Sequence, residues 1–172
     1  MIDLIGIDSM RQGLTVESVE YHLLWFESPP KPQIVDVVSM AVEINFGDAG
    51  RARFHWRIDP TFEGLEVGPW KVGDAATELS HVDATDRWGL SGARLARYVV
   101  ATQLTDRGEA QMPWSCRLVF EDDRNLVIAL GELSPEGQLT YLPDSLIVTA
   151  SQEVACGYRL DSSASTAWVE GC

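Results

Sequence analysis

The sequence predicts a mainly β fold with little helix, an antiparallel sandwich or a partly open barrel built from hairpins. Apolar and polar residues alternate with a period of two in several runs, as in strands that bury one face. Short groups of turn residues, at 47–50 and 123–125, separate pairs of these runs. We expect the 172 residues to form a single domain, 1–172, with 151–172 as a loosely docked C-terminal tail.

The first two expected strands lie at 19–25, before the Ser28-Pro29-Pro30 break, and at 34–46. One face of the second run is apolar: Ile34, Val38, Met40, Val42, Ile44 and Phe46. Asp36 interrupts that face near its start, where we expect the end of the strand to be accessible to solvent.

Residues 51–58 also alternate, and the glycines just before them predict a hairpin with the preceding strand. We expect a three-residue loop, 48–50, with Gly50 in the left-handed conformation that glycine tolerates. That register places Ile44 near Phe54.

A second hairpin joins 114–121 to 126–130. We expect Asn125 to take the left-handed position of its loop, so that Phe120 faces Ile128. Apolar residues occur on both faces of this hairpin, which predicts a central place in a sheet.

The other elements have weaker patterns. The β-branched and aromatic residues of 95–104 favour a strand, although a helical stripe also fits them, and 145–150 resembles a strand. A short helix is expected at 74–81, with Asp74 as N-cap. The stretch 59–92 is expected to be a long, partly structured connection, either a binding element or ordinary structure.

The formal net charge of −13 argues against nucleic acid and against an anionic membrane as partners, because both require a cationic surface. It permits a basic protein partner. The N-terminus lacks the pattern of a signal peptide, so we expect a cytoplasmic protein whose three cysteines are reduced thiols, with a Cys156–Cys172 bridge as the alternative. Cys116 falls on the expected core face, and the oligomeric state is left open.

No recognisable motif for catalysis, metal binding or phosphate binding occurs, so we expect no catalytic residues, no metal and no cofactor. His22, His55 and His81 lie far apart in the sequence. Four basic-type side chains nevertheless share one strand face: Arg51, Arg53, His55 and Arg57. This row is either neutralised by acids such as Glu43 on neighbouring strands or forms an anion-binding strip.

The segment WSCRLVFEDDRNLVIALGEL, followed by LTYLPDSLIVTAS, resembles the C-terminal half of small bacterial proteins. Some of these resemble immunity proteins of polymorphic toxin systems. The resemblance covers about residues 114–150 and rests on Trp114, the 116–130 hairpin, Gly131-Glu132 and the Tyr141–Asp144 segment. It implies a shared fold and context and supplies no catalytic residues.

These observations favour a non-enzymatic, acidic protein-binding domain, such as an immunity or inhibitor protein that occludes a basic partner. The expected contacts are Trp70, Asp74, Glu78, Asp83, Asp86 and Trp88. One alternative is a small-molecule-binding barrel or sandwich, with or without catalysis, in which the Arg/His row holds an anion. Another is a structural or assembly module.

Overall fold

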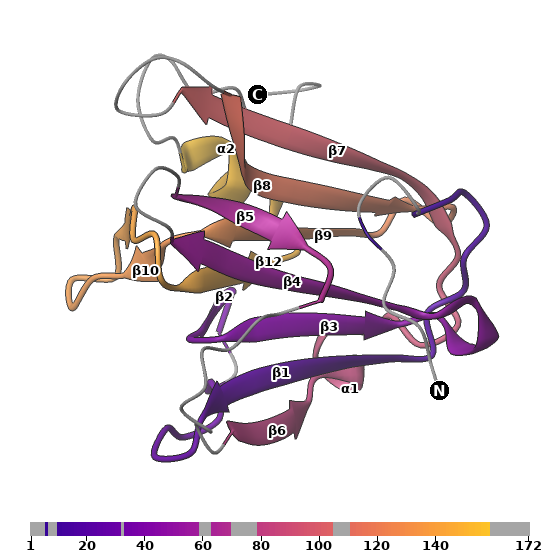
Figure 1. The fold of residues 1–172 in the computed structure, drawn as a ribbon, viewed down its shortest axis with the longest axis horizontal. Coiled ribbons are helices and arrows are strands. Elements are labelled where there is room, and N and C mark those ends of the chain that lie inside the picture. Colours follow the sequence, from indigo (N-terminus) through magenta and orange to yellow (C-terminus); the bar gives the residue numbers. More distant parts are fainter. Residues whose placement is uncertain are drawn as a thin grey trace.

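The structure is a computed structural model. It describes residues 6, 10–31, 33–58, 63–69, 79–104 and 111–158. These residues form two five-stranded sheets and one two-stranded sheet, and every strand pair among them is antiparallel (Figure 1). The prediction of a mainly β, antiparallel fold is therefore confirmed.

The first sheet has, in spatial order, β5 (Glu63–Val67), β4 (Arg51–Ile58), β3 (Ala41–Asn45), β1 (Ser18–Leu24) and β6 (Leu79–Asp83). The second sheet has β2 (Val35–Val38), β12 (Leu146–Thr149), β9 (Asn125–Leu130), β8 (Gln111–Phe120) and β7 (Leu95–Leu104). The small third sheet pairs β10 (Glu132–Leu133) with β11 (Leu139–Thr140). The helical elements in the described part of the chain are the 3₁₀ turn η2 (Gly47–Ala49), α1 (Thr85–Trp88) and α2 (Gln152–Gly157).

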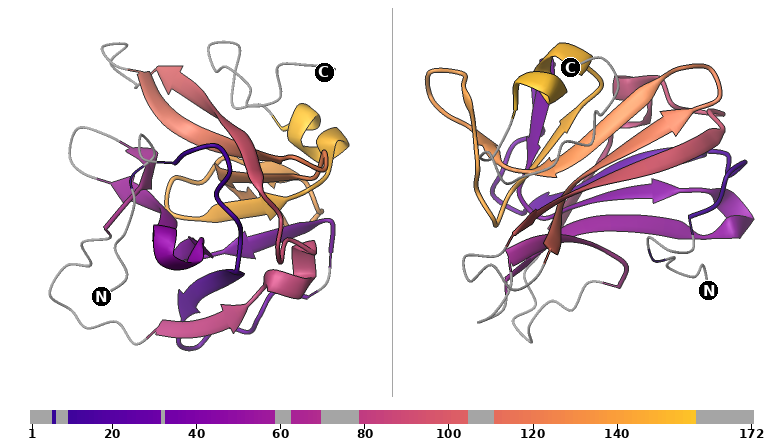
Figure 2. Two further views of the ribbon diagram at one scale, coloured as in Figure 1. Left: turned by 90° about the vertical axis from the view of Figure 1, so that its right-hand side faces the viewer. Right: turned by 90° about the horizontal axis from the view of Figure 1, so that it is seen from above.

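The two large sheets form separate layers, and α2 lies beyond the second sheet (Figure 2). Side chains of both sheets fill the core between them, among them Tyr21, Ile44, Phe54, Leu118, Leu126, Ile128 and Leu146. At Gly64 of β5 the first sheet comes against β8. A Cβ there would lie 3.0 Å from the Met112 side chain and 3.3 Å from the Pro113 carbonyl oxygen, so this close approach favours glycine.

The expected continuous strand at 34–46 is wrong. The chain bends at Ser39–Met40 and passes from β2 in the second sheet to β3 in the first. The alternation continues through the bend because both strands bury a face against the same core. A periodic pattern shows which face is buried and does not show which strand lies alongside.

The first hairpin has a different register from the one expected. Asn45 pairs with Arg51 and Val42 pairs with Phe54, a shift that leaves the faces unchanged. The turn is the 3₁₀ element η2, closed by a hydrogen bond from Phe46 N to Gly50 O. Gly47, with φ 62°, and Gly50, with φ 108°, both have a positive φ that favours glycine.

The second hairpin also turns earlier than expected. Its left-handed residue is Asp123, with φ 65°, and Phe120 N donates to Arg124 O. Ile128 therefore pairs with Cys116 and not with Phe120. The expected central position is confirmed, because β8 and β9 both lie inside the second sheet.

The stretch 59–92 contains more regular structure than expected, namely β5, β6 and α1. Residues 79–81 of the expected helix belong to the strand β6, because they pair with β1. Residues 74–78, and with them the expected cap Asp74, lie outside the described residues. The strands expected at 51–58, 95–104 and 145–150 are confirmed.

Part of the C-terminal segment packs closely against the sheets. The Tyr158 hydroxyl donates to Leu130 O at 2.6 Å, and its ring contacts Trp114 edge to face at 5.5 Å. Ser151 caps α2, since its hydroxyl accepts a hydrogen bond from Val154 N.

Cys156 is disulfide-bonded, so the expectation of a reduced thiol is wrong for this residue.

Asp36 is only 1% exposed, so the expectation that this end of the strand is accessible to solvent is wrong. Arg87 of α1 approaches its carboxylate with two donors, Nε at 3.0 Å from Oδ2 and Nη2 at 2.9 Å from Oδ1. The Tyr21 hydroxyl donates to the same carboxylate at 3.0 Å and accepts from the Trp88 indole. A buried carboxylate with these partners is compensated, and it connects β2, β1 and α1.

Replacement of Arg87 tests this connection. Because Arg87→Ala leaves the Asp36 charge buried without its cation, we expect the free energy of unfolding to fall by about 3–5 kcal/mol in urea titration. The control Arg124→Ala removes the exposed pair with Asp122 and should cost less than about 1 kcal/mol. Equal, small effects of the two variants would contradict the proposed connection.

Cys116 supplies a second test. Its side chain is fully buried in β8, and this burial raises the pKa of the thiol to about 12. We expect the Cys116 peptide to remain unmodified by a thiol reagent at neutral pH in the folded protein and to be labelled in guanidinium chloride, as followed by mass spectrometry. Rapid labelling in the native state would show that the core opens readily.

Candidate functional site

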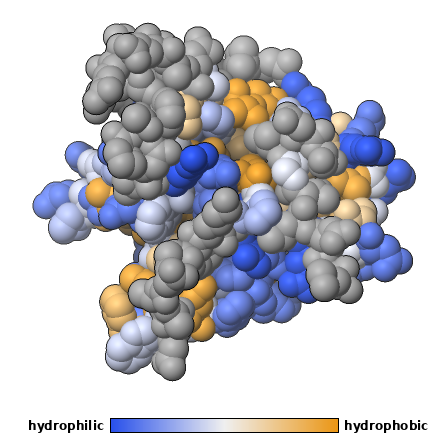
Figure 3. Space-filling view, in the orientation of Figure 1, coloured by the Kyte–Doolittle hydropathy of each residue, from blue (hydrophilic) through white to orange (hydrophobic). Residues whose placement is uncertain are grey.

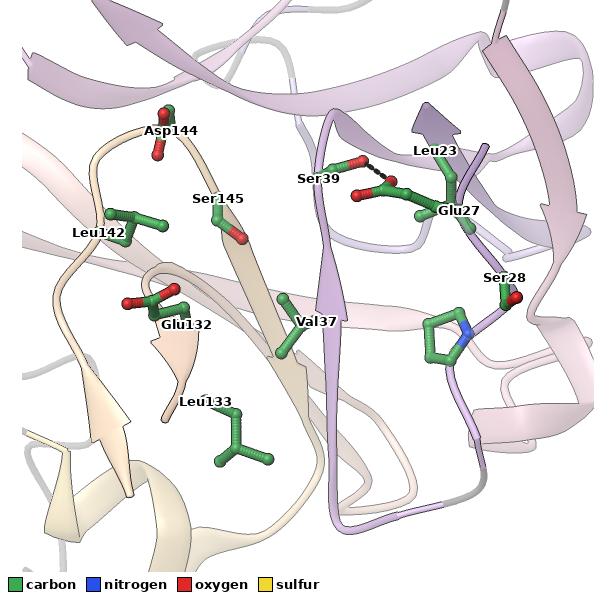
Figure 4. A pocket seen from close by; sticks show the side chains of 11 residues that line it. Leu23, Glu27, Ser28, Val37, Ser39, Glu132, Leu133, Leu142, Asp144 and Ser145 are labelled. Atoms are coloured by element: carbon green, nitrogen blue, oxygen red, sulfur yellow. Dashed lines mark hydrogen bonds between the residues drawn. The ribbon is translucent and has the colours of Figure 1, made fainter. Parts of the chain in front are cut away.

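An open cleft of about 550 Å³ lies where the end of β1 and the strand β2 face the β10–β12 region. In Figure 4, one wall carries Leu23, Glu27, Ser28 and Ser39, and the other carries Glu132, Leu133, Leu142, Asp144 and Ser145. Val37 of β2 lies between the two walls.

The cleft combines negative charge with apolar surface. Its carboxylates come from Glu27, Glu132 and Asp144, and none of the described residues that line it is basic. Its apolar lining is Leu23, Pro30, Val37, Leu133 and Leu142. A cationic group attached to an apolar body matches this combination.

The Glu27 carboxylate is held in place by the turn that follows β1. Glu27 N donates to Leu24 O at 2.9 Å, which closes the turn. Glu27 Oε2 in return accepts from Leu24 N at 3.0 Å and from the Ser39 hydroxyl. The carboxylate is therefore oriented before any ligand arrives, which lowers the entropic cost of binding.

Trp25 and Phe26 occupy the middle of the same turn and are 66% and 65% exposed. Their rings contact each other edge to face with centroids 5.6 Å apart. Ile34, just before β2, is 67% exposed. Figure 3 shows hydrophobic surface around the end of β1, at lower left. Large exposed aromatics beside a charged cleft are typical of a binding surface.

The contacts expected from the sequence do not include this surface, although the sequence contains a signal for it. Leu23, Leu24, Trp25 and Phe26 are consecutive apolar residues, and a strand directs neighbouring side chains to opposite faces. They cannot all be buried on one side, and the prolines that follow prevent the strand from continuing. This run at the end of a strand therefore favours an aromatic side chain outside the core.

The Arg/His row lies on the outer face of β4, as expected. Glu43 of β3 accepts from Arg51 Nη1 at 2.8 Å and from Arg53 Nε at 2.8 Å. Arg57 lies 3.6 Å from Glu66 of β5, and the His55 ring is buried. Acids on neighbouring strands therefore contact three of the four side chains, with two carboxylates against three guanidinium groups.

Burial by itself would raise the pKa of Glu43. The hydrogen bonds and charge of Arg53, joined by Arg51, outweigh this effect and hold the pKa below its usual value.

The structure describes three of the six residues expected to contact a partner. Trp70, Asp74 and Glu78 lie outside the described residues. Asp83 and Asp86 are exposed, at the end of β6 and in α1. Trp88 packs against the core and donates its indole N–H to Tyr21, so it has a structural role.

The structure brings two distant histidines together. His22 of β1 and His81 of β6 are directly paired, and Glu20 lies beside both. Within the described part of the chain, this trio is the group whose side chains could share a metal ion. The third histidine, His55, lies in the same row on the far side of Ala41.

Comparison of the chain with protein-family models, with curated proteins and with solved structures finds no match. In the described part of the chain, no helix has the length and apolar character needed to cross a membrane.

The Glu43 pairs generate a pH-dependent prediction. A carboxylate whose folded-state pKa is lowered stabilises the protein above its unfolded pKa of about 4.3, and this contribution is lost as the pH falls through the folded value. We expect Glu43→Gln to cost about 1.5–3 kcal/mol at neutral pH, and the difference from the parent protein to shrink below about pH 4. Urea titration of both proteins across this range measures it. A difference that grows on acidification would contradict the assigned pairs.

Proposed function

We propose that this protein is a non-enzymatic binding domain that takes a basic segment of a partner protein into its acidic cleft and occludes that segment. The observation that carries the proposal is the cleft with three carboxylates and apolar walls, next to the exposed Trp25–Phe26 pair. An immunity or inhibitor protein acts in this manner when it covers a basic functional surface.

Charge supports the choice of a basic partner. The protein has a formal net charge of −13, so its field attracts cationic surfaces from a distance. At short range, a lysine or arginine side chain can extend its methylene stem along Leu133 and Leu142 and direct its charge to Glu132 or Asp144. Steering and local recognition therefore favour the same class of ligand.

The exposed aromatic pair favours a macromolecule over a small amine. Trp25 and Phe26 belong to the turn that supplies Glu27, but they are not among the residues that line the cleft. A ligand that uses both features must extend beyond the cleft. Aromatic side chains that become buried at an interface are frequent sources of binding energy, which suits a protein partner.

The alternative of an anionic small-molecule ligand has less support. The acidic groups that contact Arg51, Arg53 and Arg57 already occupy part of their donor capacity. The cleft itself is lined by carboxylates, which repel anions.

Selection from a random peptide library tests the proposed chemistry directly. We expect peptides selected on the full-length protein to be enriched in lysine or arginine flanked by apolar residues. The affinity of the best synthetic peptide should fall as salt is added. A selection without basic residues would contradict the proposal.

Variants then locate the binding surface. The variant Trp25→Ala/Phe26→Ala removes the aromatic contacts, and Glu132→Gln/Asp144→Asn removes two charges of the cleft. We expect each variant to weaken binding of that peptide by about tenfold or more. The matched control Glu121→Gln/Glu153→Gln removes two exposed acidic charges elsewhere, in the β8–β9 turn and in α2, and should leave the affinity unchanged. Equal losses in the two charge variants, with no loss in Trp25→Ala/Phe26→Ala, would show that net charge alone attracts the peptide.

A further inference from the structure

The outer face of the first sheet carries a row of histidines that chain topology alone brings together. His22 and His81 are paired across β1 and β6, 59 residues apart, and their rings are 4.5 Å apart. Glu20 lies two residues before His22 and so projects from the same face. The three side chains converge on one spot near the edge of the sheet.

Their distances match a metal-binding arrangement. Glu20 Oε1 lies 3.3 Å from His22 Nε2 and 2.8 Å from His81 Nδ1. The three ligand atoms all lie within 4.8 Å of one another. Tetrahedral zinc with bonds of about 2.0–2.1 Å separates its ligand atoms by about 3.3 Å. Small side-chain rotations would therefore suffice to surround an ion.

His22 supplies an independent observation. Its side chain is only 4% exposed, and its Nε2 atom has no hydrogen-bond partner, because its contact with Glu20 lacks hydrogen-bond alignment. A buried polar atom without a partner is rare and calls for a physical explanation. The hydrogen bond between His81 and Glu20 satisfies polar atoms of those two side chains, but it provides no partner for His22 Nε2.

We propose that Glu20, His22 and His81 bind a divalent transition-metal ion of the zinc class. One carboxylate oxygen and two imidazole nitrogens form a ligand set typical of zinc, with a further coordination position open to water. His81 and Glu20 are 52% and 39% exposed, so an ion can enter from solvent.

The surroundings of the cluster are compatible with a cation. Burial, followed by the charges of Arg53 and His81, lowers the pKa of His22, which favours the neutral form that coordinates metals. Arg53 would repel an ion, but Glu43 binds this guanidinium and places its own Oε2 3.9 Å from His22 Nε2. Asp83, directly opposite Glu20 on β6, adds a further negative charge to the same face.

A bound ion would connect β6, an edge strand, to β1 through side chains in addition to the backbone ladder. This role is independent of the acidic cleft, because the cluster lies on the outer face of β1 while Leu23, which lines the cleft, points to the other face.

Titration with Co²⁺, followed by competition with Zn²⁺, tests the site on the full-length protein without a histidine tag. We expect one ion per chain and a visible Co²⁺ spectrum typical of four-coordinate nitrogen and oxygen ligation. Zn²⁺ should also raise the melting temperature, because it binds only the folded state. A dissociation constant for Zn²⁺ weaker than about 100 μM would overturn the proposal.

Variants assign the ligands. His81→Ala alters a half-exposed residue and should weaken Zn²⁺ binding by at least about 30-fold and abolish the thermal shift. Glu20→Gln should weaken Zn²⁺ binding by about tenfold or more. This variant tests a second ligand whose side chain is partly exposed. The matched control His55→Gln changes a histidine that lies roughly 9–10 Å from His22 across Ala41 and should keep the Zn²⁺-induced shift. Unchanged affinity in His81→Ala, or an equal loss in His55→Gln, would overturn the assignment.

Discussion

The buried Asp36 carboxylate is the constraint on which much of the architecture depends. A charge in this position requires a cation, and Arg87 supplies it from a helix about fifty residues further along the chain. The pair fixes α1 against β2, and the Tyr21 hydroxyl joins β1 to the same carboxylate. Because β1 belongs to the first sheet and β2 to the second, one carboxylate holds the two layers together at this end.

The strand β1 links the scaffold to both proposed sites. Its inward face carries Tyr21, its outward face carries Glu20 and His22, and its end leads into the Trp25–Phe26 turn. Alternation of side chains along a strand allows one segment to hold the core on one face and polar chemistry on the other. The acidic cleft forms beyond the end of this strand, where the chain leaves the first sheet and enters the second.

Acidic residues fall into distinct groups according to their surroundings. Glu43 and Asp36 are buried, and each is compensated by arginine. The carboxylates of the cleft line a surface that carries no described basic residue. The first group stabilises the fold, whereas the second retains an unbalanced field that can attract a cation. Formal net charge does not distinguish these groups, and their difference is central to the proposed function.

Local patterns in the sequence determined the antiparallel β class, the strands at 51–58, 95–104 and 145–150, and the central place of the second hairpin. They also determined which side chains of β4 point outward, because alternation follows from backbone geometry. Only the tertiary structure decided the hairpin registers, the division of 34–46 between two sheets, and the meeting of His22 with His81. The acidic cleft was also decided only by the tertiary structure, since its walls come from segments far apart in the sequence. The physical reason is that period-two alternation fixes the face of a residue, whereas its partner strand depends on the packing of the whole chain.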